Sequence, residues 1–357
     1  MTSVTTTNWM LYGTYGTTGR LILAEALRRG HRPVLAGRDE ARLTALKAET
    51  GLEAVVVPLD NAVAMREVLG RVGIVLNAAG PFHATGRPLR RGCLDCGVSY
   101  IDINGEIQDF MDTLACDALA RERGIAMIPG AGFGVVFGEA LAAHVWARLP
   151  DAAWLRLSLA PANSLKSRGA LRSTVSALAG GGYVIRHGEL LNLPLASERW
   201  RLRAAVGSDP SIGFAAAPRA ELVAVQRSTG MREIVVGIPL SRPAALLLRA
   251  VGTHLGRWLL RMTMAPSTGS RPKDRVVHAD VRSRLWAEAG NATGSRVFST
   301  LETGEGYRSS ATAAVLAVER TLETHPIGAL TPAQAFGANF ALSAPSTRID
   351  DLVLNTE

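Results

Sequence analysis

Cysteine, lysine and aromatic residues are scarce in this chain of 357 residues, and each shortage excludes a class of protein. Three cysteines, Cys93, Cys96 and Cys116, are too few for a disulfide framework and suit a reducing compartment. Cys93 and Cys96 make one C-x-x-C pair without a second pair, so we predict no metal site and interpret them as small packing residues. Aromatic residues make up 5% of the chain, and no zinc finger, basic helix or aromatic RNA-binding motif is present, so nucleic acid is not an expected partner.

Long apolar runs are also missing, because a transmembrane helix needs about 20 largely uncharged residues. The most apolar segment, residues 243–266, contains Arg249, Arg257 and Arg261 and predicts an amphipathic helix. Three roles for this helix stay open: covering the core, closing over a lipid-like substrate, or contacting a membrane surface. The first residues are polar and rich in threonine, without the basic and apolar regions of a signal peptide, so we expect a cytoplasmic protein.

Basic residues outnumber acidic residues by 39 to 31, which gives a net charge of +8. Only Lys47, Lys166 and Lys273 are lysines, so the other 36 basic residues are arginines. An arginine excess attracts anions such as phosphorylated cofactors, carrier-bound thioesters or acidic partner proteins. It is equally typical of a compositional bias, because the arginines are spread along the chain and do not form one block.

Short apolar runs alternate with helical stretches over the first 130 residues, as in a parallel sheet built from βαβ units. The strands expected there are residues 9–12, 33–36, 54–58, 74–78, 100–103 and 126–129, and the helices are 18–29, 40–49 and 88–97. After a Gly-rich crossing at residues 129–138 the pattern changes to α+β. We expect a helix at 137–148, strands at 154–160 and 199–205, a long hairpin of 276–288 with 295–303, and helices at 309–322 and 331–342.

A G-x-x-G-x-x-G loop follows the first predicted strand and opens a helix. The first glycine allows a tight turn, the second lets the backbone approach a pyrophosphate, and the third lets the helix pack close to the strand. Because strand, loop and helix agree, we predict that this helix N-terminus binds the phosphates of a dinucleotide. The loop comprises Gly13, Thr14, Tyr15, Gly16, Thr17, Thr18 and Gly19.

Arg38 follows the second predicted strand, where an NAD site usually carries an acidic residue for the ribose 2′-hydroxyl. A guanidinium there can pair with a 2′-phosphate and stack on adenine, so we predict NADP(H) as the cofactor. Asp39 is expected to cap the next helix and Asp60 to receive the adenine. Small residues after the fourth strand let the cofactor lie flat with the nicotinamide ribose nearby: Asn77, Ala78, Ala79, Gly80 and Pro81.

These segments, with Tyr100-Ile101-Asp102 and then Gly105-Glu106, resemble the saccharopine dehydrogenase-like oxidoreductases. Later segments resemble the branch that contains the trans-acting enoyl reductases: residues 129–134, 167–169, 172–173, 306–308 and 331–333. The resemblance implies an α/β protein with an N-terminal Rossmann-type parallel sheet and an α+β substrate domain whose sheet is mostly antiparallel. The implied domains are 1–130 for dinucleotide binding, 131–306 for the substrate, and 307–357 as a helical return to the first domain.

The candidate catalytic residues are His83, Asp102 and Tyr100, and the candidate substrate residues are Phe82, Phe133, Arg168 and Tyr307. His83 could donate a proton near neutral pH, and Arg168 could hold a carboxylate or phosphate. Asp102 and Glu106 are also expected to hydrogen-bond backbone amides at a loop and a helix start. Where many relatives have Cys-Gly-Phe-Asp-Ser, this chain has a run of glycine, alanine, phenylalanine and valine at 130–135, which removes polar side chains.

The resemblance implies hydride transfer from NAD(P)H to a C=C or C=N bond. We predict an NADPH-dependent reductase of the C=C bond in a polyketide-like, lipid-like or carrier-bound substrate, with an acyl carrier or synthase as a partner. Two alternatives stay open: reduction of an imine derived from an amino acid, and a nucleotide-binding module that senses redox state without chemistry. The substrate and the oligomeric state are not predicted.

Overall fold

The computed structural model describes residues 8–162, 181–194, 197–201, 213–239 and 281–352. The chain forms two compact units, and each unit is assembled from two stretches of sequence. Residues 1–136 and 306–345 make the first unit, and residues 137–305 and 346–357 make the second. Arg168 and the amphipathic helix predicted at 243–266 lie outside the described residues.

A seven-stranded sheet forms the centre of the first unit, with the order β15-β6-β5-β4-β1-β2-β3 and parallel pairing throughout. Its strands are β1 (Trp9–Tyr12), β2 (Val34–Gly37), β3 (Ala54–Val56), β4 (Ile74–Asn77), β5 (Ser99–Asp102), β6 (Ala126–Ile128) and β15 (Gly328–Ala329). The chain moves outward from β1 in one direction to β3, then returns to β4 and moves outward in the other direction. This is the strand order of a doubly wound dinucleotide-binding fold, which confirms the predicted fold class for this unit.

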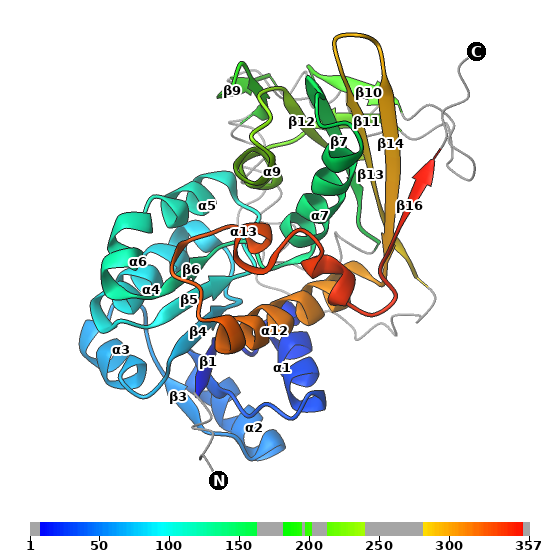
Figure 1. Ribbon diagram of the computed structural model, residues 1–357. Coiled ribbons are helices and arrows are strands. Elements are labelled where there is room, and N and C mark those ends of the chain that lie inside the picture. The colour runs from blue at the N-terminus through cyan, green and yellow to red at the C-terminus, as the bar shows by residue number, and fades with distance from the viewer. Residues whose placement is uncertain (1–7, 163–180, 195–196, 202–212, 240–280, 353–357) are drawn as a thin grey trace, which may run out of the picture. The chain divides into compact units, whose positions relative to one another are not determined.

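Helices cover both faces of this sheet, so its central strands are apolar along their whole length. Met10, Leu11, Leu35 and Leu76 have no exposed surface, as expected for parallel strands that are buried on both sides. Helix α1 (Thr17–Arg28) packs along α12 (Gly306–Thr324), which links the two stretches of sequence in this unit (Figure 1). The other helices are α2 (Glu40–Thr50), α3 (Ala62–Leu69), α4 (Phe82–Cys96), α5 (Ile107–Leu114), α6 (Asp117–Arg123), α13 (Pro332–Phe336) and a 3-10 helix, Phe340–Ser343.

The second unit contains a nine-stranded mixed sheet, in which β12 and β7 pair in parallel and the other pairs are antiparallel. The predicted mostly antiparallel second sheet is therefore confirmed. Its strands are β7 (Trp154–Ala160), β8 (Gly182–Arg186), β9 (Glu189–Leu193), β10 (Arg199–Arg201), β11 (Gly213–Ala216), β12 (Ile234–Pro239), β13 (Ser283–Gly290), β14 (Arg296–Thr303) and β16 (Arg348–Leu352). Among the described residues of this unit, the helices are α9 (Glu221–Thr229) and most of α7 (Phe133–Arg148).

Four predicted elements differ from the structure. The helix expected at 88–97 begins at Phe82 as α4, with Pro88 inside it. Helix α7 begins at Phe133, inside the Gly-rich run that was expected to be a crossing. Glycine is a poor helix former, but Gly132 and Gly138 allow close packing here: an added Cβ would lie 3.2 Å from the Ile103 carbonyl oxygen and 3.0 Å from a Leu157 methyl group, respectively. The helix expected at 331–342 is split by Gly337, whose φ is +89°. The last strand, β16, pairs with β14 in the second unit, whereas a helical return to the first domain was expected.

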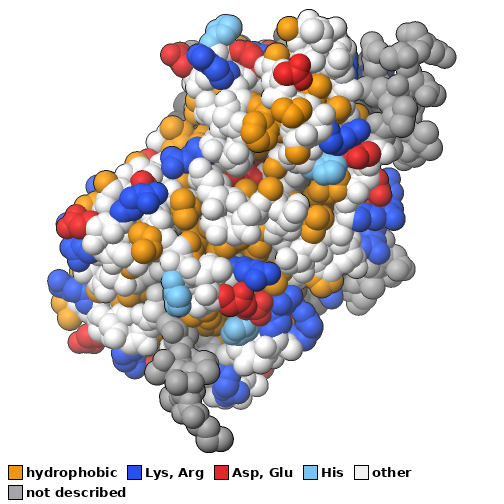
Figure 2. Space-filling view, viewed as in Figure 1, with side chains coloured by type: hydrophobic (Ala, Val, Ile, Leu, Met, Phe, Trp, Pro, Cys, Tyr) orange, Lys and Arg blue, Asp and Glu red, His pale blue; other side chains and the backbone are white. Residues whose placement is uncertain are grey.

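No helix among the described residues is long and apolar enough to cross a membrane. Within those residues, no group of His, Cys, Asp and Glu side chains has the arrangement of a metal site. Cys93 is fully buried in α4 and behaves as a packing residue, as predicted. On the face shown in Figure 2, basic side chains are interspersed with acidic ones and do not gather into one patch.

Candidate functional site

The site predicted from the sequence lies at the carboxyl ends of β1, β2, β4 and β5 in the first unit. In an open parallel sheet, ligands bind beyond these ends, at the point where the strand order reverses. Here that point is the pair β1 and β4, which are hydrogen-bonded neighbours with Tyr12 opposite Asn77. The glycine loop follows β1 and the small-residue segment follows β4, so the two segments emerge side by side.

The glycines of the loop have different steric roles. Gly13 has a φ of +85°, and an added Cβ would lie 2.7 Å from the Cβ of Ala79, so the glycine loop and the segment after β4 touch at this residue. An added Cβ on Gly19 would lie 2.2 Å from the carbonyl oxygen of Gly13. Gly16 is less crowded, with its nearest neighbour, the same Gly13 oxygen, at 3.3 Å. Packing within the protein thus requires Gly13 and Gly19, whereas Gly16 leaves the backbone accessible.

Helix α1 begins at this loop without a capping side chain. Its N-cap residue is Gly16, and no acidic residue stands in its first turn. By contrast, Asp39 caps α2 by accepting from Arg42 N, as predicted, and Asn61 caps α3 in the same way. The backbone N–H groups at the start of α1 therefore remain for an anion, which the helix dipole also favours.

Tyr15 reaches from the glycine loop to the end of β2. Its hydroxyl accepts a hydrogen bond from Arg38 N at 3.1 Å, and its ring lies so close to Gly37 that an added Cβ there would be 2.6 Å from a ring carbon. The guanidinium of Arg42 lies 5.6 Å from the centre of the Tyr15 ring. The Arg38 side chain is exposed, so it is accessible to a ligand. The sequence predicted Arg38 but did not predict that Tyr15 or Arg42 would lie beside it.

Asp60 lies close to the same group of residues. Burial raises the pKa of Tyr12 to about 12, and the charges of Arg38 and Asp60 act on it in opposite directions, which places both near the end of β1. The Tyr12 hydroxyl donates to the Val57 carbonyl oxygen at 3.0 Å and so joins the ends of β1 and β3. Arg38 and Asp60 therefore both lie within electrostatic range of Tyr12, at the end of β1.

Asn77 shapes the segment after β4. Its Oδ1 accepts from Ala79 N at 3.0 Å, and its Nδ2 donates to the Tyr100 hydroxyl at 3.1 Å. Thr85 of α4 donates to the Ala79 carbonyl oxygen at 2.5 Å, and the bond between Gly80 and Pro81 is cis. Ala79 and Gly80 are at least partly exposed, so a fixed backbone at residues 77–81 is presented at the sheet edge. No sequence signal pointed to Thr85.

Tyr100 and Asp102, two of the candidate catalytic residues, have no exposed surface. Burial raises the pKa of Tyr100 well above its usual range. Burial also raises the pKa of Asp102 to about 7, although its Oδ1 accepts from Gly130 N and Asn104 N, both at 2.9 Å. Its second oxygen, Oδ2, has no hydrogen-bond partner of ordinary geometry among the described residues. The expected backbone bonding of Asp102 is therefore confirmed, and this carboxyl fixes residues 102–104 to the segment at 130.

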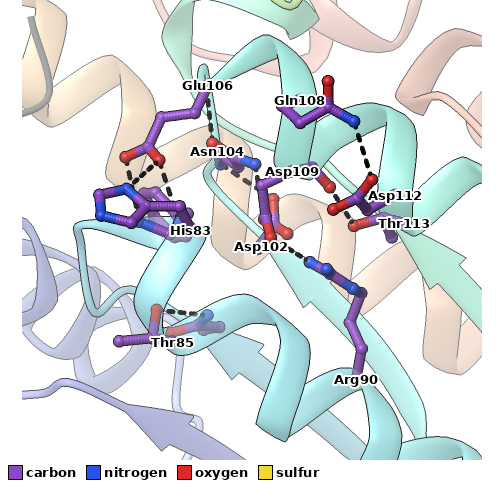
Figure 3. A network of polar contacts seen from close by, with 12 residues as sticks. His83, Thr85, Arg90, Asp102, Asn104, Glu106, Gln108, Asp109, Asp112 and Thr113 are labelled. Carbon is purple, nitrogen blue, oxygen red and sulfur yellow. Dashed lines mark hydrogen bonds and ion pairs between the residues drawn. The ribbon is translucent and has the colours of Figure 1, made fainter. Parts of the chain in front are cut away.

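His83 and Glu106 form one end of the network in Figure 3, where the His83 ring is exposed and the Glu106 side chain is mostly buried. The Glu106 carboxylate accepts from Phe82 N and His83 N, both at 3.0 Å, so its expected bonding to backbone amides is confirmed, although at α4 and not at the helix that follows it. The His83 ring nitrogen Nδ1 lies 3.0 Å from Glu106 Oε2. Beneath this pair, Arg90 and Asp109 form a buried ion pair at 2.6 Å.

The remaining substrate candidates have the following positions. Phe82 and Phe133 are largely buried, with 8% and 7% of their surface exposed. Phe133 N donates to the Ser310 hydroxyl at 2.9 Å, which joins the start of α7 to α12. Tyr307 is half-buried in the first turn of α12. Phe82 adjoins the segment at 77–81, and Tyr307 lies three residues before Ser310 on α12.

Residues 9–128 match the family described as the saccharopine dehydrogenase NADP binding domain. These residues, which contain six of the seven strands of the first unit, are a domain of this family. The cofactor of the first unit is accordingly NADP(H).

The relatives compared here share little sequence identity with this chain. The trans-acting enoyl reductase of Mycobacterium ulcerans is 23% identical, and the alignment covers 95% of this chain and 96% of that protein. The saccharopine dehydrogenase-like oxidoreductase of Bos taurus is 27% identical over 35% of this chain. This chain spans only about a third of the length of such relatives: 34% of the bovine protein, 32% of the Arabidopsis thaliana protein and 34% of the human protein. The crystal structure of saccharopine dehydrogenase (L-Glu forming) from Saccharomyces cerevisiae has a TM-score of 0.65 at 10% identity and covers 97% of this chain and 100% of that chain, which shows a shared fold.

Proposed function

We propose that this protein is an NADPH-dependent reductase of a C=C bond in a polyketide-like, lipid-like or carrier-bound substrate. The observation that carries the assignment is the similarity to a trans-acting enoyl reductase over 95% of the chain, and the candidate cofactor residues at the strand ends of the first unit support it. In this proposal the first unit binds the cofactor and the second unit contributes to substrate binding. An acyl carrier or synthase would present the substrate.

The residues of the first unit fit NADPH. The uncapped start of α1, with Gly16, would bind the pyrophosphate, because its N–H groups have no protein cap. Arg38 would pair with the 2′-phosphate, and Asp60 lies nearby for the adenine. The backbone at residues 77–81, which Asn77 and Thr85 hold in place, would support the nicotinamide ribose. When bound, NADPH supplies the hydride, and the protein supplies orientation and electrostatics.

The segment at 130–135 favours an apolar substrate over an amino acid. Ala131, Gly132 and Phe133 are buried and carry no charge, where the family resemblance implies polar residues. An imine made from an amino acid would bring several carboxylates, which require positively charged or hydrogen-bonding partners. Phe82, Phe133 and Tyr307 are the candidates for substrate contact among the described residues of this unit, and His83 is the candidate proton donor.

The test compares two substrate classes in one assay. NADPH oxidation is followed with trans-2-enoyl thioesters of N-acetylcysteamine, and separately with mixtures of an amino acid and a keto acid. We expect faster oxidation with the thioesters, and a Gly16→Val variant, whose cofactor site is blocked, should lose the activity and so exclude a contaminating reductase. Turnover of the amino acid mixtures alone would reverse the assignment. Tight NADPH binding without turnover of either class would favour a redox-sensing module.

A further inference from the structure

Glu106 lies just before α5 but forms its hydrogen bonds with α4. Its Oε1 accepts from Phe82 N, and its Oε2 accepts from His83 N, each at 3.0 Å. The carboxylate therefore occupies the N-terminus of α4, where backbone N–H groups and the helix dipole favour a negative charge. The same Oε2 lies 3.0 Å from Nδ1 of the His83 ring. One side chain thus fixes both the backbone and the ring of His83 (Figure 3).

A buried chain of hydrogen bonds holds Glu106 in this position. Asn104 Oδ1 accepts from Glu106 N at 2.6 Å, and Asn104 Nδ2 donates to Asp109 Oδ2 at 2.9 Å. Asp109 is paired with Arg90 at 2.6 Å, and both side chains are at most 5% exposed. Gly86 makes room for this pair, because an added Cβ would lie 2.5 Å from the Arg90 guanidinium. Glu106 is therefore anchored to the core and is not a mobile surface residue.

The contact with Glu106 fixes which nitrogen of the His83 ring carries the hydrogen. A carboxylate only accepts hydrogen bonds, so Nδ1 must be the donor, and in a neutral ring Nε2 then has no hydrogen. The His83 side chain is 58% exposed, whereas that of Glu106 is 15% exposed. No hydrogen bond from Nε2 is present among the described residues, whereas Nδ1 is held by Glu106 in a side chain that is mostly exposed. An imidazole with one nitrogen fixed and the other accessible is the arrangement of a proton-transferring histidine.

We propose that Glu106 is a positioning residue that orients His83 as the proton donor of the reduction. The inference rests on the proposed function. The substrate C=C bond gains a hydride at one carbon, with NADPH oxidised to NADP⁺, and the other carbon takes the Nε2 proton of the His83 imidazolium. The neutral ring keeps its Nδ1 hydrogen bond to Glu106 and takes a new proton from water at its exposed side.

A capping role alone would account for the two backbone bonds of Glu106 but not for the bond to the ring. The first unit offers a control for this distinction, because His31 Nε2 lies 3.0 Å from Glu319 Oε1 in a second histidine–glutamate pair. His31 follows α1 and precedes β2, so it lies at the amino ends of the strands, at the opposite edge of the sheet from the cofactor residues. A Glu319→Gln variant should therefore leave turnover unchanged.

The first experiment measures the tautomer of His83 by two-bond proton–nitrogen correlation spectroscopy on protein with nitrogen-labelled histidine. A His83→Ala variant assigns the signal. We expect the Nδ1–H form in the wild type and a shift towards the Nε2–H form in Glu106→Gln, because glutamine offers one acceptor oxygen where Glu106 uses two. An Nε2–H form in the wild type, or no change in Glu106→Gln, would overturn the inference. This measurement needs neither cofactor nor substrate, so its failure leaves the proposed function standing.

The second experiment separates kcat from cofactor affinity, with the octenoyl thioester of N-acetylcysteamine as substrate. We expect His83→Ala to lower kcat about 10²- to 10⁴-fold and Glu106→Gln at least about tenfold, with NADPH affinity unchanged. Added imidazole should restore part of the activity of His83→Ala but not that of Glu106→Gln, which still has the ring. A normal kcat in His83→Ala would overturn the inference, whereas failure of the wild type to bind NADPH would overturn the proposed function.

Discussion

Arg38 is the side chain on which the choice between NADPH and NADH depends. It is exposed at the end of β2, with its backbone N–H held by the Tyr15 hydroxyl. Loss of one charge-assisted contact costs about 1.5–3 kcal/mol, so Arg38→Ala should weaken NADPH binding about ten- to a hundredfold and leave NADH binding almost unchanged. Fluorescence titration of both cofactors into both proteins measures this.

The control for this prediction is Arg71→Ala. Arg71 is also exposed and pairs with Glu53 at 2.9 Å, so its loss removes the same charge from the surface of the first unit. Its effect on either cofactor should be small, because surface charges are screened by salt. Equal weakening of NADPH and NADH in Arg38→Ala would contradict a contact with the 2′-phosphate.

Asp102 should make the stability of the protein depend on pH. Burial raises its pKa from an ordinary 3.8 to about 7. Between these values the folded protein holds a proton that the unfolded chain has released, so the free energy of unfolding falls as pH rises, by about 1.4 kcal/mol per pH unit. Above pH 7 both states are ionised and this dependence ends. Urea unfolding of the wild type and Asp102→Asn from pH 4 to pH 8 measures how much Asp102 contributes to the pH dependence of the free energy of unfolding.

The Asn variant keeps an acceptor oxygen for Gly130 N and Asn104 N but does not titrate. The free energy of unfolding of this variant should therefore change less with pH than that of the wild type. The difference in favour of the variant should be greatest near pH 8. Asp112→Asn, at an exposed carboxylate on α5, is the matched control and should follow the wild-type curve. Identical curves for wild type and Asp102→Asn would show that this carboxyl titrates in an ordinary way.

Single residues with local partners were predictable from the sequence. Asp39 stands three residues before the amide that it caps, and this spacing is a recognised helix start. Glu106 was singled out, but its partners Phe82 and His83 are 24 and 23 residues away, so only the fold brings them together. Tyr15 and Arg38 are likewise 23 residues apart. Local patterns carry no information on such contacts, which explains why these parts of the site were not predicted.

At the scale of elements, the turn from β1 into α1 separates two effects of glycine replacement. Gly16→Val should abolish binding of NADPH and NADH with the fold intact, because Gly16 is extended, its nearest contact is at 3.3 Å, and the new side chain would cover the start of α1. Gly19→Ala should instead destabilise the fold by about 1–3 kcal/mol, because its Cβ would meet the Gly13 oxygen at 2.2 Å. Circular dichroism, denaturant unfolding and cofactor titration distinguish the two.

The comparison between the two variants provides the control. If Gly16→Val binds both cofactors with wild-type affinity and shows a normal circular dichroism spectrum, the loop is a structural turn only. If Gly19→Ala is as stable as the wild type, the helix can shift away from β1 and the tight packing is not required.

Periodicity predicted the elements of the first sheet well, because its strands are short apolar runs between clear helices. β1 at Trp9–Tyr12 matches the prediction, and the ends of β2 to β6 differ by at most two residues, whereas the two-residue strand β15 was not predicted. The start of α7 was missed because its glycines look like a loop when their packing partners are unknown. Composition gives the local preference of a segment, and tertiary packing then overrides it.

At the scale of the whole molecule, the family resemblance implied that the chain returns to the first unit near residue 307, but the last crossing to the second unit was not predicted. The chain leaves the first unit after residue 136, returns at residue 306 and leaves again after residue 345. α12 packs along α1, although almost 300 residues separate them, as the bond between Arg29 and Glu319, 290 residues apart, shows. The segment after residue 345 carries no signal of its own for joining a second sheet, since five residues of mixed polarity could form an edge strand in either unit.

Deletion of residues 346–357 tests whether the two units depend on each other. The deletion removes β16, which pairs with β14 from Phe298 to Glu302, and removes Asp351, whose Oδ1 lies 2.8 Å from both His144 Nε2 and Ser299 Oγ. All the proposed cofactor residues belong to the first unit, so NADPH affinity should stay within about twofold of wild type. Thermal unfolding should show a lower transition for the second unit, because β14 becomes an unpaired edge.

NADPH provides the second half of this experiment, because a ligand stabilises only the unit that binds it. At a hundredfold excess over Kd, NADPH adds about 2.7 kcal/mol to the stability of the folded state. This increase should appear in the transition of the first unit, by the same amount in the wild type and in the shortened chain. Asp351→Ala keeps the strand but loses the bonds to His144 and Ser299. The unfolding temperature of its second unit should therefore lie between those of the wild type and the shortened chain. Loss of NADPH binding in a shortened chain that still folds would show that cofactor binding requires β16, and that the first unit does not act alone.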